Sequence, residues 1–127
     1  MNRFRDILQN GIKLASDGNL DAALRKFNEG LKLKPTKDDE HWVVHLHRNA
    51  ALIHEKRGNL RKAKQCYLSA LKYDRSDPYT YFSLGDLCER LSQMNAARRY
   101  FARCQEFAVQ RKDEDLLKIL SDRGHSQ

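Results

Sequence analysis

The sequence predicts an all-α protein built from antiparallel helix pairs, and three observations support this fold class. Apolar residues recur at steps of three and four along most of the 127 residues, which is the period of a helix with one buried face. No stretch alternates apolar and polar residues cleanly, as a half-buried strand would. Turn-forming residues separate the apolar runs, and the phrase Gly-Asn-Leu at residues 18–20 returns at residues 58–60.

The first pair of helices is expected at residues 3–16 and 20–34. Between them, Asp17-Gly18-Asn19 supplies residues that tolerate a left-handed backbone, as a tight helix–helix turn requires. Pro35 ends the second helix, because proline disfavours the helical conformation in the residue before it. The chain then has to turn before the next helix begins.

The second pair is expected at residues 37–57 and 60–74, around a turn that again contains Gly-Asn. Thr36 can cap the third helix, with Asp39 completing a pair that resembles a capping box. The third helix is longer than its counterpart in the first pair, because six extra residues fall around Thr36–Trp42.

The third pair is expected at residues 78–91 and 94–111, followed by a last helix at 113–121. Asp77-Pro78 is a strong start signal, since it joins a capping carboxylate to a proline at the first helical position. Acidic residues fill the first turn of the last helix, where the helix dipole favours them. The side chains of this helix expected to pack inward are Leu116, Leu117 and Leu120.

Residue spacing connects these pairs to a known family. The turn at Gly58 lies 40 residues after Gly18, and Ser92 lies 34 residues after Gly58. A helix–turn–helix period of 34 residues is typical of the tetratricopeptide repeat. Four positions agree with that family's pattern in all three pairs. The first helices carry a small residue midway, at Gly11, Ala51 and Gly85. The second helices carry alanine at Ala23, Ala63 and Ala97, then an aromatic residue at Phe27, Tyr67 and Phe101, and then a small residue at Gly30, Ala70 and Cys104. Over residues 4–111 the chain therefore resembles the tetratricopeptide-repeat family.

Some positions depart from the family pattern. A large ring is expected where the chain has Leu14, His54 and Cys88. A proline is expected after each second helix, and Pro35 matches whereas Arg75 and Val109 do not. The mismatch at Val109 suggests that the sixth helix continues past this point.

The resemblance implies a right-handed superhelical stack of helix pairs, an α-solenoid, closed by a capping helix. It implies one domain over residues 1–127, with repeats at about 4–37, 44–77 and 78–111 and the cap at 113–121. It also implies that the first helix of each pair lines a concave groove that binds a peptide or helix of another protein. The groove residues implied are Arg5, Leu8, Ile12, His45, Arg48, Asn49, Leu52, Lys56, Tyr79, Phe82, Ser83, Asp86 and Arg90.

One family subtype grips the C-terminal carboxylate of heat-shock chaperones through lysine, asparagine and arginine side chains. The equivalent positions here are Leu8, Ile12, Asn49, Tyr79 and Ser83, and of these Asn49 alone matches. A clamp for a chaperone tail is therefore not expected, although Arg5, Arg48 and Arg90 could form a different anion site.

The sequence gives no reason to expect catalysis or cofactor binding. The sequence has no phosphate-binding loop, no G-x-S-x-G and no plausible Ser–His–Asp set, so we expect a non-enzymatic protein without cofactor or metal. A cytoplasmic location is expected, because no signal-peptide core or membrane-spanning run occurs. The three cysteines also lack C-x-x-C spacing, which fits reduced thiols in a cytosol.

Several alternatives remain open beside these expectations. His41 and His45, with Asp38, have the spacing of a metal chelate but lack a fourth ligand, so surface histidines are favoured. His47 and His54 are expected to be partly buried. Cys88 and Cys104 are expected to be buried and inert rather than redox-active.

The leading hypothesis is a small adaptor that binds a protein segment in its groove. A second hypothesis is self-association into a homo-oligomer through Trp42 and the end helices, although Trp42 is expected to pack on the first repeat. A third is nucleic-acid binding, since the formal net charge is +7. The basic residues concerned are spread over several helices, so this idea ranks last: Lys56, Arg57, Arg61, Lys62, Lys64, Arg98, Arg99 and Arg103.

Overall fold

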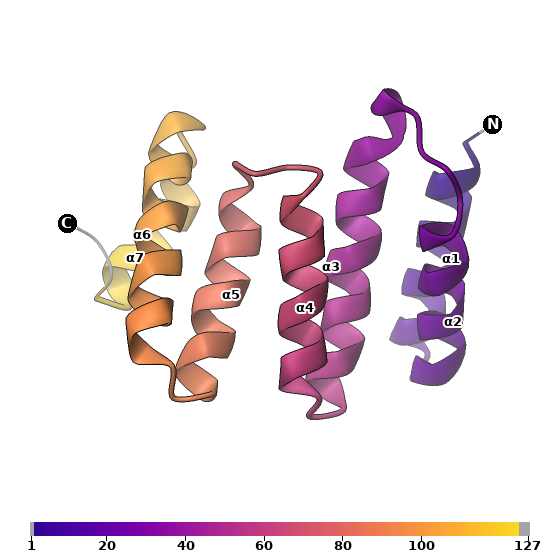
Figure 1. Cartoon of the computed structure of the whole chain (residues 1–127), viewed down its shortest axis with the longest axis horizontal. Helices are drawn as coiled ribbons and strands as arrows, with labels where there is room; N and C mark the ends of the chain where they lie inside the picture. Colours follow the sequence, from indigo (N-terminus) through magenta and orange to yellow (C-terminus); the bar gives the residue numbers. More distant parts are fainter. Residues whose placement is uncertain (1, 125–127) are drawn as a thin grey trace. The chain divides into compact units, whose positions relative to one another are not determined.

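The computed structural model describes residues 2–124, and within that range the regular elements are helices (Figure 1). The elements in order are α1 Arg3–Ser16, α2 Leu20–Leu31, the 3₁₀ turn η1 Lys37–Asp39, α3 Glu40–Lys56, α4 Leu60–Leu71, α5 Pro78–Arg90, α6 Met94–Gln110 and α7 Glu114–Asp122. The all-α class and the expected helix order are confirmed.

Residue contacts divide the chain into two compact units, Met1–Arg75 and Ser76–Gln127, which we call unit 1 and unit 2. The expectation of a single domain over residues 1–127 stays a prediction, and residues 1 and 125–127 lie outside the described residues. No described helix is long and apolar enough to cross a membrane.

Unit 1 consists of two helix pairs, α1 with α2 and α3 with α4. Its core lies where α1, α2 and α3 meet, and the buried side chains there are Phe4, Ile7, Leu8, Ala23, Phe27, Val43, Leu46, Ala50 and Ile53. Gly30 allows this close packing, because a Cβ on it would lie 2.9 Å from Leu46 Cδ1. The repeated small residues are therefore the points where helices approach one another.

Unit 2 consists of the pair α5 and α6 and the final helix α7, which packs on α6. Its core comprises Cys88, Ala97, Phe101, Cys104, Ala108, Leu116 and Leu120. Leu117 is partly buried against this core, so the expected inward face of the last helix is confirmed. That helix covers the apolar face that the pair α5 and α6 leaves open.

The helix starts follow their sequence signals. Asp77 caps α5, with its carboxylate accepting from the Tyr79 backbone N–H at 3.1 Å and from the Thr80 hydroxyl at 2.7 Å. Thr36 and Asp39 form the expected capping box. It opens η1, which runs directly into α3, so helical structure begins at residue 37 as expected, although its first turn is 3₁₀ rather than α-helical.

Two helix ends differ from expectation. The expected ends at residues 34 and 74 are wrong, because α2 ends at Leu31 and α4 ends at Leu71. The backbone closes there with short-range bonds, such as Leu33 N–H to Gly30 C=O at 3.1 Å. Leu33 still packs against the unit 1 core, so the apolar period continues beyond the last helical residue.

The three equivalent turns share one backbone form. Gly18 and Gly58 have φ of +83° and +77°, and Ser92 takes the same place with φ of +60°. Glycine adopts positive φ without a Cβ clash, whereas serine does so at a cost. The third turn thus keeps the geometry of the first two after losing their glycine.

Candidate functional site

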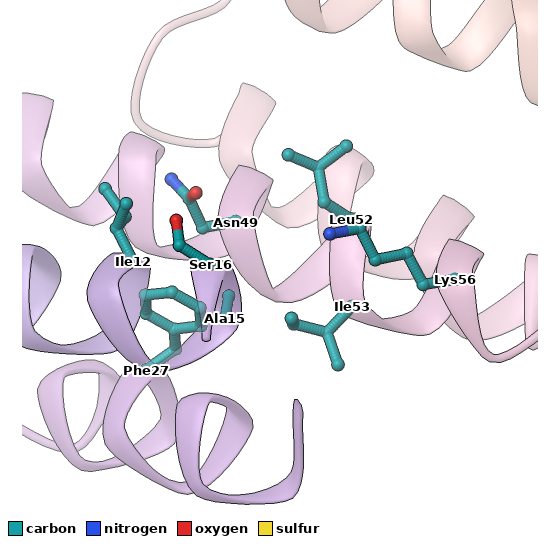
Figure 2. Close-up of a pocket in the computed structure, with 8 residues that line it drawn as sticks. All are labelled: Ile12, Ala15, Ser16, Phe27, Asn49, Leu52, Ile53 and Lys56. Carbon is teal, nitrogen blue, oxygen red and sulfur yellow. The ribbon is translucent and has the colours of Figure 1, made fainter. Parts of the chain in front are cut away.

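A small hollow lies between α1 and α3 in unit 1, with a volume of about 180 Å³ (Figure 2). Its lining side chains are Ile12, Ala15 and Ser16 from α1, Phe27 from α2, and Asn49, Leu52, Ile53 and Lys56 from α3. Four of these were predicted as groove residues: Ile12, Asn49, Leu52 and Lys56. We call this feature the unit 1 hollow.

The floor and the flanks of the unit 1 hollow are apolar. Phe27 and Ile53 belong to the buried core, whereas Ile12 is 41% exposed and Leu52 is 48% exposed. Large aliphatic side chains with this much exposure on both sides of a hollow can bury further area only when another molecule covers them.

Polar groups of the unit 1 hollow come from the same helices. The Asn49 amide nitrogen donates to the His45 backbone C=O at 2.8 Å, which fixes the side chain and leaves its amide oxygen to accept from another molecule. Lys56 adds an exposed ammonium group, one turn from Leu52. With the Ser16 hydroxyl, the unit 1 hollow therefore combines apolar surface with two acceptor groups and one cation.

The other predicted groove residues of unit 1 are placed unevenly. Leu8 is 6% exposed and belongs to the core, so its side chain is not at the surface as the groove assignment required. The sequence allowed Leu8 to be either a core or a groove residue, because buried and exposed residues follow one another closely along α1. Arg5 and His45 are exposed and Arg48 is half-buried, and none of the three lines the unit 1 hollow.

In unit 2, two predicted groove residues are engaged by residues at the two ends of α7. The Tyr79 hydroxyl donates to the carboxylate of Asp113, the residue that caps α7. This hydrogen bond raises the pKa of Tyr79 to about 12, and it lowers the pKa of Asp113. At the other end, the guanidinium of Arg123 lies over the Phe82 ring, 5.1 Å from its centroid.

The predicted groove residues Asp86 and Arg90 lie beside that contact. Arg123 Nη2 is 3.4 Å from Asp86 Oδ1 and 2.8 Å from Glu89 Oε1. Arg90 Nη1 is 3.8 Å from Asp86 Oδ2. Ser83, on the same helix, is half-buried.

Several residues at these places were not predicted. Glu89 could have been found, because residues 82, 86 and 89 share one helical face. Ala15 and Ser16 follow Ile12 by one turn and could have been found in the same way. Asp113 and Arg123 carry no sequence signal for these contacts, because they meet α5 from 34 or more residues away.

The histidines do not gather into a metal site within the described residues. His41 and His45 are exposed, and no group of three or more possible ligands is present in residues 2–124. His47 and His54 are half-buried as expected, and they line a second hollow between α2, α3 and α4. Burial is the main cause that lowers the pKa of both histidines. The charge of Lys72 adds to the effect at His47, and that of Lys62 adds to it at His54.

Cys88 and Cys104 are fully buried in the unit 2 core, as expected. Burial is the main cause that raises the pKa of Cys104 to about 12, and a thiol held protonated is a weak nucleophile. Cys66 lies half-buried in unit 1, and burial raises its pKa as well.

Some of the residues behind the alternative hypotheses have partners in the structure. Trp42 is partly buried against the unit 1 core, and its packing on the first repeat stays a prediction. Arg57 pairs with Asp21, and Arg103 Nη1 lies 3.7 Å from Glu106 Oε2. These contacts occupy part of the surface on which self-association or nucleic-acid binding was based.

Comparison with known proteins shows the family of the repeats. The family model described as tetratricopeptide repeat matches residues 46–77 and 78–108. No curated protein sequence matches the chain.

Solved structures of the same fold cover most of the chain. The second tetratricopeptide-repeat domain of Spaghetti (RPAP3), bound to the HSP90 peptide SRMEEVD, has a TM-score of 0.71 and 17% identity, over 84% of this chain and 93% of its own. PcrH, from Pseudomonas aeruginosa, in complex with the chaperone binding region of PopB, has a TM-score of 0.72 and 16% identity, over 86% and 85%. The Hsp90 co-chaperone Cns1 from Saccharomyces cerevisiae has a TM-score of 0.70 and 15% identity, over 95% of this chain and 42% of its own. These likenesses establish the fold.

Proposed function

Because the chain belongs to the tetratricopeptide-repeat family, we propose that it is a non-enzymatic adaptor that binds a segment of a partner protein. The observation that carries the proposal is the unit 1 hollow, flanked by the exposed side chains of Ile12 and Leu52. Spaghetti and PcrH, which share the fold, have been solved with bound partner segments. Free thiols at all three cysteines fit the cytosolic location included in the proposal.

The size of the unit 1 hollow suits one apolar side chain of the partner. Its volume of about 180 Å³ is close to that of protein cavities that hold a benzene ring, about 150 Å³. Full burial of an aliphatic side chain stabilises by about 1.5–3 kcal/mol, and the partly exposed Ile12 and Leu52 would each contribute a fraction of that. An apolar anchor in the hollow would thus supply the main part of the affinity.

The polar groups favour a particular neighbour for that anchor. The Asn49 amide oxygen would accept a backbone N–H of the bound segment, and Lys56 would pair with an acidic side chain. A formal net charge of +7 favours an acidic segment in the same way. We therefore propose a partner segment with an aliphatic or aromatic side chain next to a carboxylate. A chaperone C-terminal tail is not proposed, because four of the five clamp positions differ.

The proposal is tested with tagged wild-type protein, Leu52→Asp and the matched control Leu68→Asp. Leu68 is also an exposed leucine of unit 1, 38% exposed, and it does not line the hollow. Quantitative mass spectrometry of purified complexes should identify proteins retained by wild type and Leu68→Asp and lost by Leu52→Asp.

Isothermal titration with such a partner then measures the effect directly. Leu52→Asp should weaken binding about tenfold or more, because a charge would replace a buried apolar contact. Lys56→Glu should weaken it less and reduce its salt dependence. Equal affinity of Leu52→Asp and Leu68→Asp for every recovered partner would contradict the proposal.

A further inference from the structure

The face of α5 in unit 2 holds a guanidinium group between aromatic rings and carboxylates. The guanidinium carbon of Arg123 lies 5.1 Å from the Phe82 ring centroid and 5.4 Å from that of Phe101. The two rings meet edge to face, with centroids 5.6 Å apart. Arginine stacks well on such surfaces because its planar group is weakly hydrated and attracted to the ring faces.

The carboxylates complete this set of contacts. Glu89 Oε1 lies 2.8 Å from Arg123 Nη2, and Asp86 Oδ1 lies 3.4 Å from the same nitrogen. Asp86 also has its second oxygen 3.8 Å from Arg90. We call the group formed by Phe82, Phe101, Asp86 and Glu89 the α5 cation site.

The occupant arrives from a distant part of the chain. Arg123 is the C-cap residue of α7, 34 residues after Glu89, and its helix packs on α6. Its side chain is 35% exposed, and those of Asp86 and Glu89 are 35% and 27% exposed. Ion pairs that water can reach contribute little to stability, so another cation could replace Arg123 without unfolding α7.

We propose that the α5 cation site recognises an arginine side chain of a partner protein, and that Arg123 occupies this site in the absence of the partner. Phe82 and Asp86 lie on the first helix of their pair, the helix that the family resemblance assigns to partner binding. The charge and shape of the α5 cation site commit it to a guanidinium, since a lysine ammonium lacks the flat surface that lies on Phe82.

Arg123 then acts as an internal competitor. A site filled by its own chain for nine-tenths of the time binds an external ligand about tenfold more weakly than the vacant site. A partner therefore needs further contacts elsewhere to displace Arg123.

The proposal stands on unit 2 alone, so it can fail while the unit 1 hollow binds its segment, and the reverse also holds. The test uses the full chain with ¹³C-labelled phenylalanine rings and the probe N-acetyl-arginine amide. N-acetyl-citrulline amide is the matched probe, because it has nearly the same shape without the charge. Chemical shifts of Phe82 and Phe101 report binding.

Arg123→Ala should bind the arginine probe more tightly than wild type, by about tenfold for a site that Arg123 fills nine-tenths of the time. The control Arg103→Ala removes a surface arginine that pairs with Glu106, and it should bind as wild type does. Adding Glu89→Gln to Arg123→Ala should weaken binding again. Citrulline amide should cause no shift in any variant.

Three results would overturn the proposal: equal binding by wild type and Arg123→Ala, no binding by Arg123→Ala, or equal binding of the two probes. A second variant covers the case in which Arg123→Ala loses helix α7, seen by circular dichroism. Arg123→Lys keeps a cation at the end of α7 but removes the planar group, so it should compete less well. Failure of Arg123→Lys to bind the probe more tightly than wild type would then decide against the proposal.

Discussion

The ring of Phe27 lies directly against the backbone of Gly11, where a Cβ would come within 2.8 Å of the ring carbon Cδ1. Gly85 and Phe101 repeat the relationship in unit 2, at 2.8 Å to Cζ. In the intervening pair of helices the small residue is Ala51, which is fully buried. The small and aromatic positions of the repeat are thus the contact point of each helix pair.

Gly11→Ala should therefore destabilise the protein. Overpacking costs about 1–3 kcal/mol, and the better helix propensity of alanine offsets about 1 kcal/mol of it. Urea denaturation should show a net loss, whereas Gln9→Ala, an exposed control on the same helix, should change little. Adding Phe27→Leu should recover part of the loss from Gly11→Ala. A Gly11→Ala variant as stable as the control would contradict the packing account.

The sequence predicted the helix pairs because their signals are local. Asp77-Pro78 places the start of α5 through bonds made within three residues of Asp77. Helix ends were harder, since Leu33 keeps the apolar period while its backbone has already left the helix. Periodicity reports which residues are buried and does not report whether their backbone is helical.

Asp77→Ala should cost about 1–2 kcal/mol, the usual range for the loss of an N-cap side chain. The change also removes the acceptor of the fully buried Thr80 hydroxyl, which places it near the upper end of the range. Thermal unfolding should show a larger fall in Tm than for Asp39→Ala, which breaks the exposed capping box. Asp77→Asn should lower Tm less than Asp77→Ala, because the asparagine amide oxygen can still accept a hydrogen bond. A fall in Tm no larger than that of Asp39→Ala would count against this role.

The Tyr79–Asp113 hydrogen bond should depend on pH at both extremes. The folded-state pKa of Tyr79 is raised from 10.0 to about 12. The contribution of the hydrogen bond to folding stability is therefore present below pH 10 and lost as pH rises through 12. The folded-state pKa of Asp113 is lowered from 3.8, so its contribution is present above pH 3.8 and lost as pH falls through the lowered pKa.

Carboxyl ¹³C NMR tests this coupling. Tyr79→Phe should raise the pKa of Asp113, because it removes the hydrogen bond that does most to lower it, while the Leu116 backbone N–H remains as a donor at 3.0 Å. Ultraviolet titration should show an ionisation near pH 12 that is smaller by one tyrosine in Tyr79→Phe than in the wild type. An unchanged pKa of Asp113 in the variant would show that the two groups are not coupled in solution.

The three thiols should differ in reactivity. Cys66 is half-buried, whereas Cys88 and Cys104 are fully buried, and the pKa of Cys104 is about 12. Iodoacetamide at pH 8 should label Cys66 first and the other two only after addition of urea, since the thiolate is the reactive form. Peptide mass spectrometry gives the order. Labelling of Cys104 in the native protein as fast as Cys66 would contradict the burial of the unit 2 core.

The candidate site was less predictable than the fold. The family resemblance brought Ile12 of α1 together with residues of α3, and helical spacing placed Asn49, Leu52 and Lys56 on one face of α3. Spacing could not separate Leu8, which the core takes, from Ile12 four residues later. It also could not show that Arg123 reaches α5, because contacts between distant segments depend on packing that no local pattern encodes.

The most direct test of the proposed partner binding is a photo-crosslinking measurement at the unit 1 hollow. Benzoylphenylalanine is placed at residue 52 or, as the matched position, at residue 68, and each protein is irradiated with the partner identified by purification. We predict crosslinks from residue 52 to one short partner segment that carries an apolar side chain beside a carboxylate, and none from residue 68. Crosslinks from residue 68 alone, or equally from both positions, would contradict binding at the unit 1 hollow.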